Sequence, residues 1–89
     1  MPLTIAEIKA KAASVKEDHT RSDGICYNII PPLTVRCRND LSGERAPIEK
    51  GQVLHVTHFY DKFGKFPNHI HFLEKLYWWE PEDFELVEA

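Results

Sequence analysis

The fold is decided by a stretch in the middle of the chain, which reads Ile48-Glu49-Lys50-Gly51-Gln52-Val53-Leu54-His55-Val56-Thr57-His58-Phe59-Tyr60-Asp61. Its Lys-Gly pair is typical of a turn. The residues after that pair are rich in β-branched and aromatic side chains, which favour a half-buried strand. Successive side chains of a strand point to opposite faces. We therefore predict a central strand that directs Leu54 and Val56 into the core and His55 away from it.

One helix and two strands are predicted before this central strand. The segment Thr4-Ile5-Ala6-Glu7 matches a capping box, and apolar residues follow at spacings of three and four, so we expect an amphipathic helix over residues 4–16. The polar residues 17–24 are expected to form a loop. Residues 25–30 are predicted as a short edge strand that ends at Pro31-Pro32, because proline has no N–H for the ladder. Residues 33–38 alternate as a second strand.

Shorter elements are predicted after the central strand. Residues 69–73 form the next strand, with Ile70 and Phe72 toward the core, and residues 76–79 form another. Pro81 begins one helical turn, and a last short strand follows it. The predicted fold class is therefore mainly β with an N-terminal α-helix, in a single domain of residues 1–89.

The order of these elements resembles the SH3-like barrel. The residues that carry the resemblance are Lys50-Gly51, followed by Leu54 and Val56, and the turn Pro81-Glu82-Asp83-Phe84. The likeness covers residues 33–88, and it implies a small SH3-like β-barrel built from residues 25–88. SH3 domains that bind proline-rich peptides begin with an Ala-Leu-Tyr-Asp-Tyr-like segment and carry a tryptophan soon after the middle loop. Neither feature is present here, so the resemblance implies the barrel without the proline-peptide groove.

Composition sets the class of protein. A chain of 89 residues with 43% hydrophobic and 28% charged residues has the composition of a folded domain with a small core. Its formal charge of -3 argues against non-specific binding along a phosphate backbone. The sequence has no membrane-length apolar run and no leader pattern, so we expect a cytoplasmic protein without membrane contact. Cys26 and Cys37 lack metal or redox spacing and are expected to be buried free thiols.

The aromatic residues give the first functional prediction, a surface that binds another protein. Trp78 and Trp79 are neighbours on one predicted strand, so one of them must face away from the core. The predicted contact residues are Tyr60, Phe63, Phe66, Tyr77, Trp78 and Trp79. Because the sequence has no nucleophile with a base and no phosphate-binding loop, we predict a non-catalytic adaptor or inhibitor that needs no cofactor. Accessory proteins of bacteria or their phages have this size and character.

Two alternative functions, and a homodimer, remain open at this stage. A cationic, aromatic surface would suit single-stranded nucleic acid, with the loop aromatics joined by Arg36, Arg38, Arg45 and Lys50. Three imidazoles on one outer face would suit a zinc ion with an open fourth position, and the candidate ligands are His55, His69 and His71. The thin apolar stripe of the N-terminal helix offers a contact surface for a second copy of the chain.

Overall fold

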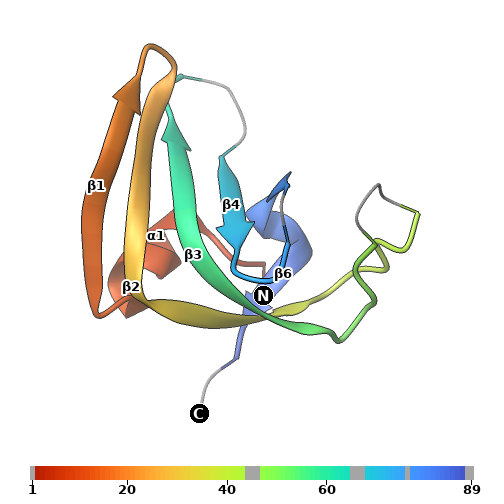
Figure 1. Cartoon of the computed structure of the whole chain (residues 1–89). Coiled ribbons are helices and arrows are strands. Elements are labelled where there is room, and N and C mark those ends of the chain that lie inside the picture. The colour runs from red at the N-terminus through yellow and green to blue at the C-terminus, as the bar shows by residue number, and fades with distance from the viewer. Residues whose placement is uncertain (1, 44–46, 65–67, 76, 88–89) are drawn as a thin grey trace.

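The strands form one twisted antiparallel sheet (Figure 1). The structure is a computed structural model that describes residues 2–43, 47–64, 68–75 and 77–87. The described residues form one helix, six strands and one 3-10 turn. In chain order these are α1 (Ile5–Lys11), β1 (Ser14–Arg21), β2 (Gly24–Cys37), β3 (Val53–Lys62), β4 (His69–Phe72), β5 (Trp78–Trp79), η1 (Pro81–Asp83) and β6 (Phe84–Leu86). The predicted fold class, mainly β with an N-terminal helix, is confirmed.

The sheet runs in the order β1-β2-β3-β4-β5, and every pairing is antiparallel. Strand β2 is long enough to have different partners at its two ends, since β1 pairs with its first half and β6 with its last residues. The pairings among the described strands leave the sheet open rather than closed into a barrel. They establish a small antiparallel β domain. No described helix has the length and apolar character that crossing a bilayer requires.

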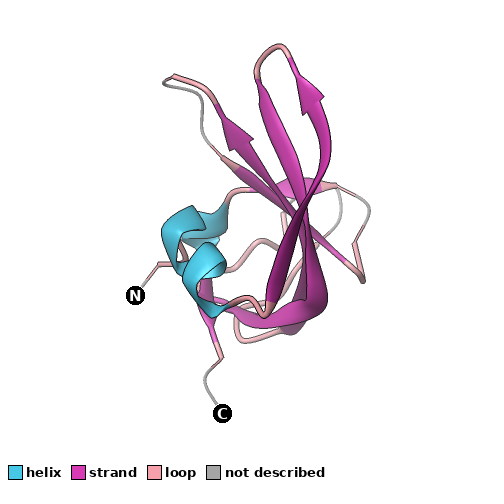
Figure 2. Cartoon of the chain, turned by 90° about the vertical axis from the view of Figure 1, so that its left-hand side faces the viewer, coloured by secondary structure: helices cyan, strands magenta, loops and turns pink. Residues whose placement is uncertain are grey.

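The predicted core at the centre of the sheet is confirmed. Leu54, Val56, Ile70 and Phe72 are all fully buried, and Val56 lies directly opposite Phe72 in the β3–β4 pair. Helix α1 lies beside the sheet (Figure 2) and covers the core with Ile8, while Leu3 just before the helix is also buried. The apolar stripe of the helix therefore packs within its own chain, and Cys26 and Cys37 are buried free thiols as expected.

The predicted helix over residues 4–16 is too long. Thr4 caps its start as expected, because its hydroxyl accepts a hydrogen bond of 3.1 Å from the Glu7 N–H. The helix ends at Lys11, and Ala12 already has extended backbone. The predicted loop over residues 17–24 is also wrong, because most of it belongs to β1, which forms a hairpin with β2. Nearly all side chains of β1 are exposed, so no buried face imposed an alternating pattern on its sequence.

The two prolines do not end the strand that contains them. Strand β2 continues through Pro31 and Pro32, and its pairing with β3 is interrupted between Asn28 and Leu33. The prolines therefore lie where β3 needs no backbone N–H from β2. Their missing donors interrupt the pairing with β3 but do not end the strand. The bond before Pro31 is cis.

Candidate functional site

A β-bulge in β3 decides which histidines share the outer face of the sheet. The register of β3 against β4 shifts between Val56, which pairs with Phe72, and His58, which pairs with His71. Two consecutive residues, Thr57 and His58, thus lie between the buried Val56 and the buried Phe59. His58 is thereby placed across from His71, with 5.9 Å between the ring centroids. His58 was not among the predicted zinc ligands, although it lies across from one of them.

The predicted group of His55, His69 and His71 is not brought together as a metal site. His55 lies on the other side of the bulge and binds Glu74, with its Nδ1 2.6 Å from Oε2 and its backbone N–H donating to Oε1 at 3.0 Å. Burial acts to raise the pKa of Glu74, but these hydrogen bonds prevail and hold it below its ordinary value. Among the described residues, the one cluster with converging metal-ligand atoms contains none of these three histidines.

The exposed aromatic surface is centred on Trp78. Trp78 is 43% exposed while Trp79 is 8% exposed and belongs to the core, so the expectation that one of the two faces outward is confirmed. The ring of Trp78 meets the Tyr60 ring edge-on at a centroid distance of 6.0 Å and lies 5.3 Å from the His71 ring. A pocket of about 290 Å³ opens beside these rings, lined by Arg21, Asp23, Tyr60, Lys62, His69 and Trp78. We call it the Trp78 pocket.

Hydrogen bonds and charges fix the walls of the Trp78 pocket. The Tyr60 hydroxyl donates to Asp23 Oδ1 at 2.6 Å, and this bond lowers the pKa of Asp23. Lys62 Nζ lies 5.6 Å from the Tyr60 ring centroid. Two cationic side chains, Arg21 and Lys62, face one carboxylate, so the pocket is positively charged although the chain carries a net charge of -3. It therefore suits an apolar group that carries a carboxylate nearby.

The remaining predicted contact residues have different positions. Phe63 is 52% exposed, and its backbone N–H donates to the Asp23 carbonyl oxygen at 2.8 Å, which places it near the rim of the Trp78 pocket. Tyr77 is also exposed, next to Trp78 in the chain. Phe66 lies outside the described residues. The Trp78 pocket was not foreseen as a pocket, because Arg21 and Asp23 come from the hairpin that was predicted as a loop.

The predicted basic residues that the structure describes lie away from the Trp78 pocket. Arg36 and Arg38 are at the last residues of β2 and just after it, whereas the pocket is beside its first residues. Arg36 Nη1 is 3.8 Å from Glu85 Oε1, and Arg38 Nη1 donates to the Glu82 carbonyl oxygen at 3.0 Å. Lys50 is exposed in the turn before β3. Arg45 lies outside the described residues.

Acidification is expected to destabilise the protein through His69. Burial lowers the pKa of His69, and the positive charge of Lys62 acts in the same direction. Between the lowered pKa of the folded state and the ordinary value near 6.5, the unfolded chain binds more protons, so stability rises with pH in that window. We expect His69→Gln to reduce the pH dependence of the free energy of unfolding, measured by urea denaturation between about pH 5 and 7. Identical pH dependence in the two proteins would contradict this assignment.

Comparison of the chain with protein-family models, with curated protein sequences and with solved structures finds no match. The function must therefore be inferred from the geometry of the Trp78 pocket.

Proposed function

We propose that this protein is a small non-catalytic binding module, an adaptor or an inhibitor, and that the Trp78 pocket receives its protein partner. The observation that carries the proposal is the 43% exposure of Trp78 on a two-residue strand whose other member is buried. An exposed indole presents a large apolar area whose burial favours association, and tryptophan is among the residues most enriched at the centres of protein interfaces.

The lining of the Trp78 pocket indicates the kind of protein segment that it accepts. Trp78 offers exposed apolar ring surface beside the largely buried ring of Tyr60, which is 7% exposed. Arg21 and Lys62 offer positive charge at the same place. A short exposed segment with an apolar side chain next to an aspartate or glutamate matches both features. The bond between Tyr60 and Asp23 holds one wall in position before binding, which reduces the conformational entropy lost on association.

We also propose that the fold is an SH3-like barrel and that the protein is a cytoplasmic accessory protein, as the sequence suggested. The described strand order and the 3-10 turn before β6 support an SH3-like barrel, with the open edge of the sheet as the difference from a closed one. An adaptor or inhibitor of this size fits a cytoplasmic accessory protein of a bacterium or phage. The nucleic-acid alternative is less well supported, because Arg36 and Arg38 make contacts within the chain and lie away from the exposed tryptophan.

Trp78→Ala is expected to abolish capture of the partner. The tagged chain would be used to capture proteins from lysate of its source cell, and captured proteins would be identified by mass spectrometry. Leu73→Ala is the matched control, since Leu73 is a large apolar residue with 69% exposure that does not line the Trp78 pocket. We expect one protein to be retained by the wild type and by Leu73→Ala and lost with Trp78→Ala.

The same experiment separates this proposal from its alternatives. If Trp78→Ala is folded and retains every protein that the wild type retains, the Trp78 pocket is not the contact surface. If the wild type instead binds single-stranded nucleic acid with an affinity that falls steeply as salt is raised, the nucleic-acid alternative is correct.

A further inference from the structure

A second site lies on the β1–β2 hairpin, where a thiol and an imidazole face each other across two strands. His19 of β1 is directly opposite Cys26 of β2 in the antiparallel register. Side chains of directly opposed residues lie on the same face, with Cβ atoms about 5 Å apart. Cys26 is 1% exposed and is not part of the main hydrophobic core cluster. Its thiol therefore lies on the same face of the sheet as the exposed His19 ring, which covers it.

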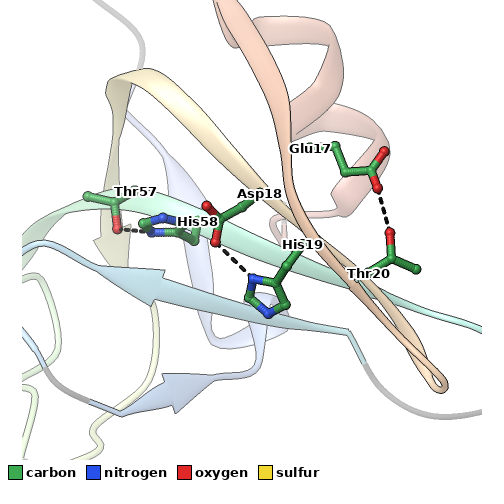
Figure 3. Close-up of polar contacts among 6 residues, drawn as sticks. All are labelled: Glu17, Asp18, His19, Thr20, Thr57 and His58. Atoms are coloured by element: carbon green, nitrogen blue, oxygen red, sulfur yellow. Dashed lines mark hydrogen bonds and ion pairs between the residues drawn. The ribbon is translucent and has the colours of Figure 1, made fainter.

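A β-bulge adds a carboxylate to the same place. The register of β1 shifts between Glu17 and His19, which leaves Asp18 without an opposite residue. In a regular strand Asp18 and His19 would point to opposite faces, but a bulge turns two consecutive residues toward one side. Figure 3 shows the result, because Asp18 and His19 point to one side of β1 while Glu17 and Thr20 are bonded together on the other. Asp18 Oδ2 lies 2.9 Å from His19 Nδ1.

These three side chains converge closely enough to hold an ion. One ligand atom from each of Asp18, His19 and Cys26 lies within 4.8 Å of the other two. Ligand atoms around a tetrahedral zinc ion, with bonds of about 2.0 to 2.3 Å, are roughly 3.3 to 3.8 Å apart. Asp18 and His19 are exposed on an edge strand, so rotation of their side chains can close this difference.

We propose that Asp18, His19 and Cys26 form a zinc-binding site with an open fourth coordination position. Thiolate, imidazole and carboxylate are the three ligand types that zinc uses in proteins. One thiolate and one carboxylate also balance the charge of a divalent cation. Burial raises the pKa of the Cys26 thiol, so the thiol keeps its proton until an ion binds, and binding releases that proton to solvent.

The surroundings of the site suit a borderline metal ion better than a hard one. His58 of β3 lies beside Asp18 (Figure 3), which offers a further nitrogen donor on the same face. Ca²⁺ and Mg²⁺ prefer shells of oxygen ligands, and this cluster supplies one carboxylate only. Asp18, His19 and Cys26 are neither the histidines predicted from the sequence nor residues that line the Trp78 pocket, although Cys26 pairs with Tyr60 of that pocket.

Binding of Zn²⁺ and Co²⁺ to the untagged, reduced, full chain tests the site. Equilibrium dialysis against ZnCl₂ with metal analysis is expected to give one zinc per chain. Co²⁺ is expected to produce a thiolate-to-cobalt charge-transfer band together with the visible bands of a four-coordinate ion. Zinc is also expected to raise the melting temperature, because it binds the folded state.

The variants separate this site from other thiols and histidines. His19→Gln changes an exposed side chain and is expected to weaken zinc binding at least about 100-fold and to remove the zinc-dependent rise in melting temperature. Cys26→Ala is expected to remove the charge-transfer band, while Cys37→Ala keeps it. His55→Gln is the histidine control and is expected to bind zinc as the wild type does. Unchanged zinc affinity in His19→Gln, or a cobalt spectrum without a thiolate band, would refute the site.

Discussion

Phe72→Ala is expected to lower the free energy of unfolding by about 3 to 5 kcal/mol, the usual cost of deleting a buried aromatic ring. Phe72 is fully buried on β4, opposite Val56 of β3, and its ring lies 4.8 Å from the ring of Phe84. It therefore connects the central strands to β6, and removing it leaves a cavity where they meet. A domain of this size has a total stability of roughly 5 to 15 kcal/mol, so the loss is a large fraction.

Phe63→Ala is the matched control for this prediction. Both changes remove one phenylalanine ring, but Phe63 is 52% exposed in the loop after β3. We expect the control to change the free energy of unfolding by no more than about 0.5 kcal/mol. Guanidinium denaturation followed by circular dichroism measures both values. A loss below about 1 kcal/mol for Phe72→Ala would mean that β3 and β4 do not share a packed core.

Gly24→Ala is expected to destabilise the protein by about 2 to 3 kcal/mol, although it adds a single methyl group. A Cβ at Gly24 would lie 2.6 Å from the Asp61 carbonyl oxygen and 2.8 Å from the Lys62 Cα, both of which belong to the backbone of the neighbouring strand. It would also lie 2.6 Å from Cε1 of Tyr60. Backbone atoms cannot move aside without disturbing the β2–β3 ladder, so the hairpin and the Tyr60 wall of the Trp78 pocket are both displaced.

Gly43→Ala makes the same chemical change where there is space. Apart from the chain neighbours of Gly43, no described residue has a heavy atom within 4 Å of the position that a Cβ there would occupy. We expect this control to unfold within about 0.5 kcal/mol of the wild type in the same denaturation experiment. Equal stability of the two glycine variants would show that β2 and β3 are not packed as closely as the register requires.

The core of the fold could be predicted from the sequence because burial leaves a period-two pattern. Leu54 and Val56 alternate with polar residues, as do Ile70 and Phe72, and in each case one face of the strand is buried. The Pro-led turn before the last strand was also predicted, since proline sets the backbone angle at its start. These features depend on residues close together in the chain.

The elements that were missed depend on contacts between distant residues. Strand β1 is an edge strand with exposed side chains, so its sequence carries no apolar alternation and reads as a polar loop. Pairing with β2 makes it a strand, and this strand begins at Ser14, three residues after the helix ends at Lys11. Pro31 and Pro32 are accepted within β2 because the ladder to β3 is interrupted there.

The candidate sites were only partly predictable, because both depend on bulges. A bulge reverses the face that all later side chains of the strand occupy. Asp18 and Thr57, where the two bulges lie, are residue types that also occur in regular strands, so the sequence does not reveal the bulges. The period-two pattern therefore groups His55 with His71, whereas in the structure His58 lies across from His71. The sequence predicts that one of Trp78 and Trp79 is exposed but not which one. The register of β5 against β4 decides between them.

The affinity of the purified partner for the Trp78 pocket tests the proposed function most directly. Once the partner has been captured, calorimetric titration would compare the wild type, Trp78→Ala and Leu73→Ala, each shown to be folded by circular dichroism. We predict that Trp78→Ala weakens binding by about 30-fold or more, the loss expected at the centre of an interface, while Leu73→Ala binds as the wild type does. Equal affinities for all three proteins would contradict the proposal.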